Sequence, residues 1–317
     1  MPHAWTPSIV AVVVASALSG HANPSGVAGS GTGAVQPRTR TVYVSATDKQ
    51  GQAVTDLQAA EFELKVAGKA RDVASVEPAK LPLRIALLVA DQGTGAFQLG
   101  IAHFMQKLLG HAEFALISVI LQPDKLIDFS HEGRDLSAAL GRLGPRGRQI
   151  GAQLMEAIQD ATKEVRHEAR RPVIVVMRLG GEAVTSLSGE DVREQLRKSG
   201  AVLHVVSAAG AQGKAPPQAT GTDAVSVQQG QFRDAELAES ASSLAQVLGD
   251  GSKESGGHYE QVIATTHARA LEQLADELLH QYAITFVLPD GVKPNDKLSV
   301  SSKRKGVTVR APSRLPN

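Results

Sequence analysis

From residue 81 onward, short continuous apolar segments alternate with longer amphipathic ones, and this alternation restricts the fold more than any other feature. The strand-like segments, rich in Val, Ile and Leu, are residues 84–90, 114–121, 126–129, 173–177, 202–206 and 282–288. The segments with helical spacing of apolar residues are 97–109, 136–143, 151–169, 189–198, 235–248 and 267–280. Strands that are apolar on both faces need helices on both faces, which is the arrangement of parallel sheets. The sequence therefore predicts an α/β fold with a Rossmann-like, doubly wound and mostly parallel sheet.

One pair of these strands is connected differently from the others. Only residues 122–125 separate the strand at 114–121 from the strand at 126–129. A helical crossover between parallel strands needs a dozen or more residues. We therefore expect an antiparallel hairpin at an edge of the sheet.

Segments with strand-like alternation flank the α/β region on both sides. Residues 41–48 alternate with period two, and residues 60–76 have the pattern of strand, turn and strand. We expect an N-terminal β unit at 39–78, an α/β domain at 81–290 and a C-terminal β-hairpin at 291–317. The hairpin is expected to pack with the N-terminal unit, so that the two form a small β-sandwich-like appendage.

The N-terminus has the features of an export signal. Residues 9–18 form an apolar core that is too short to span a bilayer, and small residues follow it up to Ala22. We predict a signal peptide at 1–22, a flexible Gly- and Ser-rich linker at 23–38, and a mature chain without a membrane span in the periplasm, envelope or medium. The segment before the apolar core lacks Lys and Arg, so a buried strand or a misplaced start codon remains an alternative.

Composition excludes several classes of function. The chain has no cysteine, which rules out disulfides, zinc–thiolate sites, iron–sulfur clusters and a cysteine nucleophile. The net charge of +1 argues against nucleic acid as a partner, and 3% aromatic residues argue against stacking platforms for single strands. The basic run Lys303–Lys305 is expected to be a solvated turn.

Catalytic motifs are also missing from the sequence. There is no G-x-S-x-G nucleophile elbow, no Walker loop and no H-E-x-x-H pair. Glu277 and His280 have the spacing used in di-iron bundles, but such sites repeat the pair on facing helices. We expect a solvated helix face there, and we predict no enzymatic activity and no cofactor.

Residues 41–78 carry a recognisable pattern of turn and strand residues. The matching positions are Thr47, Asp48, Gly51, Val54, Asp56, Leu57, Glu61 and Phe62. This pattern resembles the opening of bacterial proteins with a von Willebrand factor type A (VWA)-related domain. The segment "LPLRIALLVAD" is similar to the family's first sheet strand, and residues 274–290 are similar to its closing helix and strand. The resemblance extends over about residues 41–312 and implies a VWA-type sheet.

The resemblance also implies a metal-ion-dependent adhesion site, whose oxygen ligands come from three loops. The family supplies D-x-S-x-S, a Thr and an Asp, and Mg²⁺ needs an octahedron of such oxygens. Here Asp91 is kept, Gly93 and Gly95 replace the serines, Ala152 replaces the Thr and Leu179 replaces the Asp. Four of these five side chains lack an oxygen, so the resemblance implies a vestigial site without a metal ion.

Two alternatives concern the residues around Asp91. Thr94 in a shifted loop, or Glu182, could complete a rearranged Mg²⁺ site. Asp91 without a metal is expected to accept backbone N–H groups of the next helix, or to pair with Arg178.

These observations lead to a hypothesis about function. We expect an exported, non-enzymatic protein–protein interaction or adhesion-type domain that binds an unknown protein partner without a metal ion. A metal-dependent adhesin or sensor with a rearranged site is one alternative, and a structural scaffold of an envelope assembly is another. Open α/β sheets bind ligands beyond the carboxyl ends of their strands. The candidate binding face therefore consists of Asp91, Gln92, Thr94, Gly180, Gly181 and Glu182.

Overall fold

The computed structural model describes residues 38–145, 152–181, 184–208, 224–263, 265–288 and 291–315. The chain divides into the units Met1–Gln36 and Pro37–Asn317, and all described residues belong to the second. The predicted signal peptide, nearly all of the predicted linker, and Glu182 lie outside the described residues. No helix in the described part is long and apolar enough to cross a bilayer.

The largest sheet has the order β10-β9-β8-β5-β6-β7. Its strands are β5 (Leu83–Ala90), β6 (Ala112–Val119), β7 (Pro123–Ser130), β8 (Arg171–Leu179), β9 (Val202–Ala208) and β10 (Tyr259–Val262). Every neighbouring pair is parallel except β6 and β7, which form an antiparallel pair at one edge. This confirms the mostly parallel α/β sheet and its edge hairpin. β10 was not predicted, because its four residues Tyr-Glu-Gln-Val lack an apolar run.

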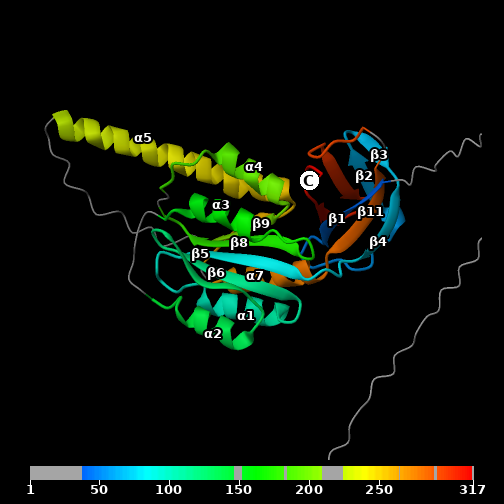
Figure 1. Ribbon diagram of the computed structural model, residues 1–317, viewed down its shortest axis with the longest axis horizontal. Coiled ribbons are helices and arrows are strands. Elements are labelled where there is room, and N and C mark those ends of the chain that lie inside the picture. The colour runs from blue at the N-terminus through cyan, green and yellow to red at the C-terminus, as the bar shows by residue number, and fades with distance from the viewer. Residues whose placement is uncertain are drawn as a thin grey trace, which may run out of the picture. The chain divides into compact units, whose positions relative to one another are not determined.

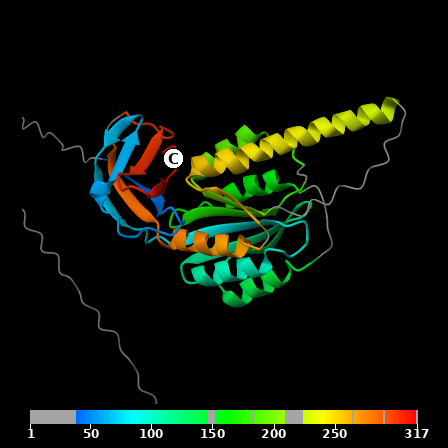
Figure 2. The same ribbon diagram turned by 180° about the vertical axis from the view of Figure 1, so that it is seen from behind.

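Helices cover both faces of this sheet (Figures 1 and 2). One layer contains α1 (Gln98–Leu108), α2 (Gly133–Gly141) and α7 (His267–Leu279). The other contains α3 (Leu154–Glu164), α4 (Gly189–Ser199) and the end of α5 (Ala224–Gln246), followed by the π-turn η2 (Val247–Gly251) and α6 (Ser252–Ser255). In β5, Ile85 and Leu87 face the first layer, and Ala86 and Leu88 face the second. This double burial explains why the strand is apolar at every position.

Two smaller sheets, of order β13-β1-β11-β4 and β12-β2-β3, face each other across a third core. Their strands are β1 (Arg38–Thr47), β2 (Phe62–Val66), β3 (Lys69–Arg71), β4 (Val73–Pro78), β11 (Tyr282–Leu288), β12 (Leu298–Ser302) and β13 (Thr308–Arg310), with the 3-10 turn η1 (Ala59–Glu61) before β2. Val44 of β1, Leu64 of β2 and Ile284 of β11 are fully buried in that core. The appendage is therefore β-sandwich-like and contains both N- and C-terminal strands.

Two details of the expected strand assignments are wrong. β11 was expected in the α/β sheet but pairs with β1 and β4. Its buried residues Tyr282, Ile284 and Phe286 alternate with more exposed ones, which is the pattern of an antiparallel strand with one covered face.

The C-terminal strands do not pair with each other as the expected hairpin. β12 pairs with β2, and β13 pairs with β1. In the connection between them, Arg304 Nε lies 2.7 Å from Glu61 Oε1 of η1, and Arg304 Nη1 lies 2.6 Å from Asp56 Oδ1. The connection passes from one sheet to the other, so each strand joins a different one.

A predicted loop also differs in part from the structure. The content of Gly, Ala, Pro and Gln predicts a long surface loop at residues 209–231, and the apolar spacing predicts a helix that begins at residue 235. Residues 209–223 lie outside the described residues, and α5 already begins at Ala224.

Candidate functional site

The loop after β5 is organised by the side chain of Asp91, which is only 1% exposed. The backbone N–H of Gly93 donates to Asp91 Oδ1 at 3.0 Å, and that of Gly95 donates to Oδ2 at 2.6 Å. The hydroxyl of Thr94 donates to the carbonyl oxygen of Asp91 at 2.8 Å. Both carboxylate oxygens are therefore used by the loop itself. α1 begins only at Gln98 and has no side-chain cap, so Asp91 holds its loop rather than the following helix.

The glycines in this loop are required by its backbone conformation. Gln92, Gly93 and Gly95 have φ angles of +59°, +76° and +73°. Serines at positions 93 and 95 would adopt this left-handed conformation at a cost of order 1 kcal/mol each. The two Gly residues that replace the metal-ligating serines thus turn their N–H groups toward the carboxylate.

A side-chain bridge joins this loop to the loop after β8. The amide Nε2 of Gln92 donates to the carbonyl oxygen of Gly180. Gly181 has a φ of +153°, and a Cβ there would lie 2.6 Å from Gln92 Nε2. Arg178 Nη2 donates to the carbonyl oxygen of Gly181 at 3.2 Å, and burial lowers the pKa of its guanidinium. Arg178, the alternative partner expected for Asp91, is therefore hydrogen-bonded to the loop after β8.

The side chains at the adhesion-site positions do not fit Mg²⁺. Ala152 packs against the core under α3, and Leu179 packs against the core on the opposite face of the sheet. The Thr94 hydroxyl, proposed for a rearranged site, donates to the backbone of Asp91 and accepts from Ala96 N at 3.3 Å. Because an octahedral cation needs about six oxygens, one carboxylate that is already hydrogen-bonded is a poor donor set.

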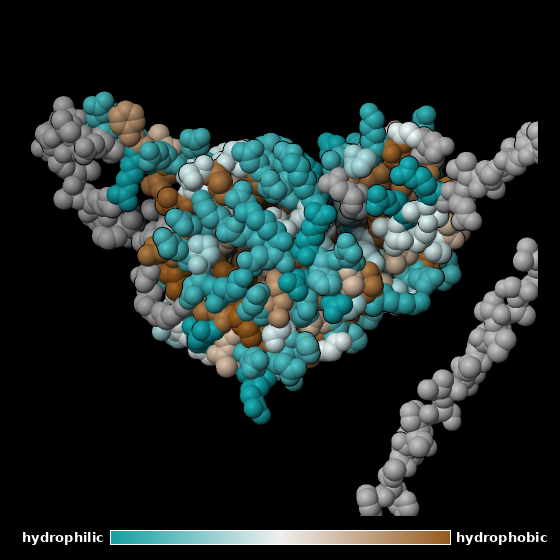
Figure 3. Space-filling view, viewed as in Figure 1, coloured by the Kyte–Doolittle hydropathy of each residue, from teal (hydrophilic) through white to brown (hydrophobic). Residues whose placement is uncertain are grey.

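Exposed apolar side chains lie at the carboxyl edge of the sheet. Leu121 follows β6 and Val184 follows β8, which are the neighbours of β5, whereas Ile263 follows the edge strand β10. Their exposed fractions are 47%, 46% and 63%. The carbonyl of Leu121 accepts from Gln153 N at 2.8 Å, and that of Ala152 accepts from Val184 N at 3.4 Å. Hydrophobic residues are visible at this end of the α/β part, on the left in Figure 3. These residues were not predicted, because a single apolar residue in a loop has no periodic signal.

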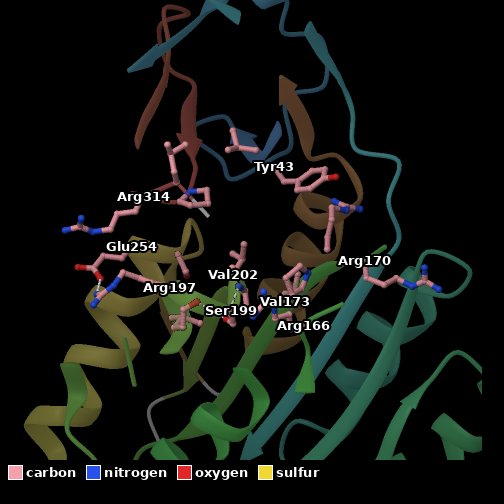
Figure 4. Close-up of a pocket in the computed structure, with 18 of the residues that line it drawn as sticks. Tyr43, Arg166, Arg170, Val173, Arg197, Ser199, Val202, Glu254 and Arg314 are labelled. Atoms are coloured by element: carbon pink, nitrogen blue, oxygen red, sulfur yellow. Dashed lines mark hydrogen bonds and ion pairs between the residues drawn. The ribbon is translucent and has the colours of Figure 1, made fainter. Parts of the chain in front are cut away.

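A second feature is a cavity of about 410 Å³ at the amino edge of the same sheet (Figure 4). It lies between the starts of β8 and β9 and the segments that contain Tyr43 and Arg314. Its guanidinium groups belong to Arg166, Arg170, Arg171, Arg197 and Arg314, and its carboxylates to Glu168 and Glu254. The walls of the cavity therefore carry more positive than negative groups.

Arg171 is the most buried of these cations. It donates to the carbonyl oxygens of Leu81 at 2.7 Å and Leu278 at 3.2 Å, and to Gln281 Oε1 at 2.6 Å. Within the described residues, no carboxylate lies within 4 Å of it, and its guanidinium lies 5.7 Å from the ring centroid of Tyr43. Burial lowers the pKa of Arg171 to about 10, so the group stays charged at neutral pH. A charge held by neutral oxygens alone is an expensive structural element.

We expect Arg171→Met to lower the free energy of unfolding by about 2 kcal/mol, because three buried acceptors lose their donor. Urea denaturation at pH 7 measures the change. The matched control is Arg166→Met, at an exposed position beside the same cavity, which should change stability by less than about 0.5 kcal/mol. Equal effects of the two substitutions would contradict this role of Arg171.

No protein-family model matches the chain, and no curated protein sequence matches it. Solved structures with similar folds include proximal thread matrix protein 1 from the mussel byssus, with a zinc-occupied MIDAS motif (13% identity, TM-score 0.42, 66% of this chain and 48% of that chain). A second is BatB from Bacteroides thetaiotaomicron (14% identity, TM-score 0.39, 62% of this chain and 97% of that chain). A third is the vWF domain of the type V pili tip protein Mfa5 from Porphyromonas gingivalis (11% identity, TM-score 0.42, 63% of this chain and 96% of that chain). The chain spans about half the length of the mussel protein.

The α/β part of the chain has a VWA-like fold. The TM-scores above are below 0.5, so this assignment rests on the sheet itself. The sheet is mostly parallel, has one antiparallel edge strand and is covered by helices on both faces, as the apolar strands and the short 122–125 connection predict, and the resemblance implied a sheet of the VWA type.

Proposed function

We propose that this chain is an exported, non-enzymatic protein–protein interaction domain of adhesion type, whose binding edge works without a metal ion. The observation that carries the proposal is the pair of exposed apolar residues Leu121 and Val184, which follow the two neighbours of β5 on either side of a loop closed by its own hydrogen bonds. Ile263 is exposed farther along the same edge of the sheet. Adhesion follows from the sequence resemblance, and export from the predicted signal peptide.

The position of this surface supports a role in binding. Open α/β sheets bind ligands beyond the carboxyl ends of their strands. Exposed apolar side chains at this edge favour contact with another protein. Asp91 is buried beneath the candidate binding face, whereas Thr94 and Gly181 are exposed on it and available for contact. Gln92 holds the two loops together through Gly180.

The hydrogen bonds of Asp91 support a metal-independent edge. Titration calorimetry of the full chain with Mg²⁺ or Mn²⁺ is expected to give no binding that depends on Asp91. Micromolar binding that is lost in Asp91→Ala would overturn metal independence and favour the alternative adhesin or sensor with a rearranged site. Binding that survives this substitution belongs to a different part of the chain.

The proposed surface is tested by capture of partners on the immobilised full chain from envelope extracts. A partner should be retained equally in EDTA and in Mg²⁺, and at least about tenfold less by the double variant Leu121→Asp/Val184→Asp, since two apolar contacts of about 1–2 kcal/mol each are lost. Leu109→Asp is the matched control, because Leu109 is also exposed but follows the carboxyl end of α1.

Two outcomes would count against the proposed surface. Retention that requires Mg²⁺ contradicts a metal-independent edge. Equal retention by the wild type, the double variant and Leu109→Asp would favour the second alternative, a scaffold that uses other surfaces.

A further inference from the structure

A cluster of potential metal ligands lies at a different place from the Asp91 loop. His204 is the third residue of β9, His258 directly precedes β10, and Glu277 lies in α7. One ring nitrogen of each histidine and one carboxylate oxygen of Glu277 all lie within 4.8 Å of one another. The cluster is therefore near the amino ends of β9 and β10, whereas Asp91 follows the carboxyl end of β5.

The surroundings of Glu277 differ from the expected solvated helix face. Glu277 is only 5% exposed, while His280, three residues later, is exposed. The carboxylate is directed into the protein, where Arg310 Nη1 of β13 donates to its Oε2 at 2.9 Å. The Glu-x-x-His spacing thus does not form a pair, and the histidines near Glu277 come from distant parts of the sequence.

Two polar atoms of the cluster are buried without a partner. His204 is 0% exposed and its Nε2 has no hydrogen-bond partner, and the same holds for Oε1 of Glu277. An unsatisfied buried polar group costs about 1–3 kcal/mol, so such atoms need an explanation. The atoms that face His258 are different ones, His204 Nδ1 and Glu277 Oε2, so the two unpartnered atoms show incomplete hydrogen bonding in the cluster and are not its ligand atoms.

The distances suit a tetrahedral ion with nitrogen ligands. His204 Nδ1 and His258 Nδ1 are 3.2 Å apart, and the two rings are inclined at 81°. Two nitrogens bound to one Zn²⁺ at their usual length are about 3.3 Å apart in a tetrahedral site. His258 Nδ1 lies 3.9 Å from Glu277 Oε2, so the carboxylate needs to approach by only about half an ångström to reach a ligand separation of that size.

The hydrogen bonding of Glu277 also suits a ligand role. Arg310 holds one oxygen of Glu277 in the way that hydrogen bonds orient ligating carboxylates in metal sites.

We propose that His204, His258 and Glu277 bind Zn²⁺, with a water molecule as the fourth ligand. Imidazole and carboxylate ligands in a tetrahedral set favour this ion over Mg²⁺, which prefers six oxygens. The side chain of His258 is 21% exposed and provides the route for the ion and the water. Because Arg310 belongs to the β-sandwich and the three ligands belong to the α/β part, the ion would fasten α7 to β9 and support the contact with β13.

The competing explanation is a hydrogen bond between the two histidines beside the Arg310–Glu277 ion pair. It needs no ion, and it accounts for the 3.2 Å separation of the nitrogens. Both explanations leave His204 Nε2 without a partner, so this atom does not decide between them. The two explanations differ in whether the purified chain takes up one equivalent of Zn²⁺.

The full chain, dialysed against EDTA and then against buffer at pH 7.5, is titrated with Zn²⁺ in a calorimeter. We expect one site, an increase in melting temperature on addition of Zn²⁺, and the visible spectrum of tetrahedral Co²⁺ when Co²⁺ is used instead. His204→Gln, His258→Gln and Glu277→Gln should each weaken Zn²⁺ binding at least about tenfold. His280→Gln is the matched control and should bind Zn²⁺ as the wild type does.

Three outcomes would overturn the proposal. These are an absence of stoichiometric Zn²⁺ uptake, binding that the three ligand substitutions do not change, and binding that disappears with His280→Gln alone. His258→Gln keeps the test decisive if the buried substitutions prevent folding, because this histidine is only partly buried. Far-UV circular dichroism of each variant shows whether it is folded.

Discussion

Gly257→Ala is expected to lower the free energy of unfolding by about 3 kcal/mol or more, or to prevent folding, because it overpacks a rigid backbone contact. A Cβ at position 257 would lie 2.0 Å from the carbonyl oxygen of Leu203 and 2.7 Å from its carbonyl carbon. Leu203 belongs to β9, which is held between β8 and β10, and its N–H donates to Ser255 Oγ at 2.9 Å. β9 therefore has no free direction in which to move away.

Urea denaturation of the wild type and the variant measures this difference. Gly133→Ala is the matched control, because nothing lies within 4 Å of a Cβ at that position at the start of α2. It should leave stability unchanged or raise it by up to about 1 kcal/mol, because alanine is favoured over glycine in a helix. A Gly257→Ala protein as stable as the Gly133→Ala protein would contradict the close approach of residue 257 to β9.

The sheet was predictable where its strands are buried on both faces. β5 and β8 have continuous apolar sequences because helices cover both sides, and this pattern leaves no other fold class. β10 was missed because it is a short edge strand with one buried residue, Val262. The sheet to which β11 belongs was assigned wrongly. Alternation shows that a strand has one covered face, but it does not identify the strand's partner.

The candidate site was predictable only in the types of its side chains. The sequence alone shows that the side chains of Ala152 and Leu179 have no oxygen atom. The structure packs Leu179 and Ala152 against the hydrophobic cores on opposite faces of the sheet. It does not show which N–H groups the Asp91 carboxylate accepts, because this depends on the φ angles of Gly93 and Gly95. The helix-capping role that we expected for Asp91 is wrong, because its two carboxylate oxygens accept N–H groups of the loop before α1.

The cluster around His204 illustrates a different limit. The two histidines are 54 positions apart in the sequence, one in β9 and the other directly before β10, and Glu277 belongs to α7. The only local signal is a histidine within the apolar segment "VLHVV", and such a residue is compatible with many buried environments. Long-range side-chain clusters of this kind follow from the fold, so they become visible only with the structure.

Asp91→Ala is expected to lower the free energy of unfolding by about 3 kcal/mol, because the buried N–H of Gly93 and the partly buried N–H of Gly95 lose a charged acceptor. Asp91→Asn should cost about half as much, because its single amide oxygen replaces only one of the two acceptors. Urea denaturation in EDTA and in Mg²⁺ measures both variants, and the presence of Mg²⁺ should change none of the curves.

The measurement in EDTA separates two roles of the carboxylate. If Asp91 were a cation ligand, its removal would relieve a buried negative charge in the metal-free protein, and the loss of stability would appear only in Mg²⁺. If Asp91 closes the loop, the loss appears fully in EDTA, because Gly93 N and Gly95 N have lost their acceptor in either solution. The backbone N–H groups of Gly93 and Gly95 then stabilise the negative charge of the Asp91 carboxylate, which a divalent cation does in an adhesion site. A Mg²⁺-dependent increase in wild-type stability that is absent in Asp91→Ala would contradict this role.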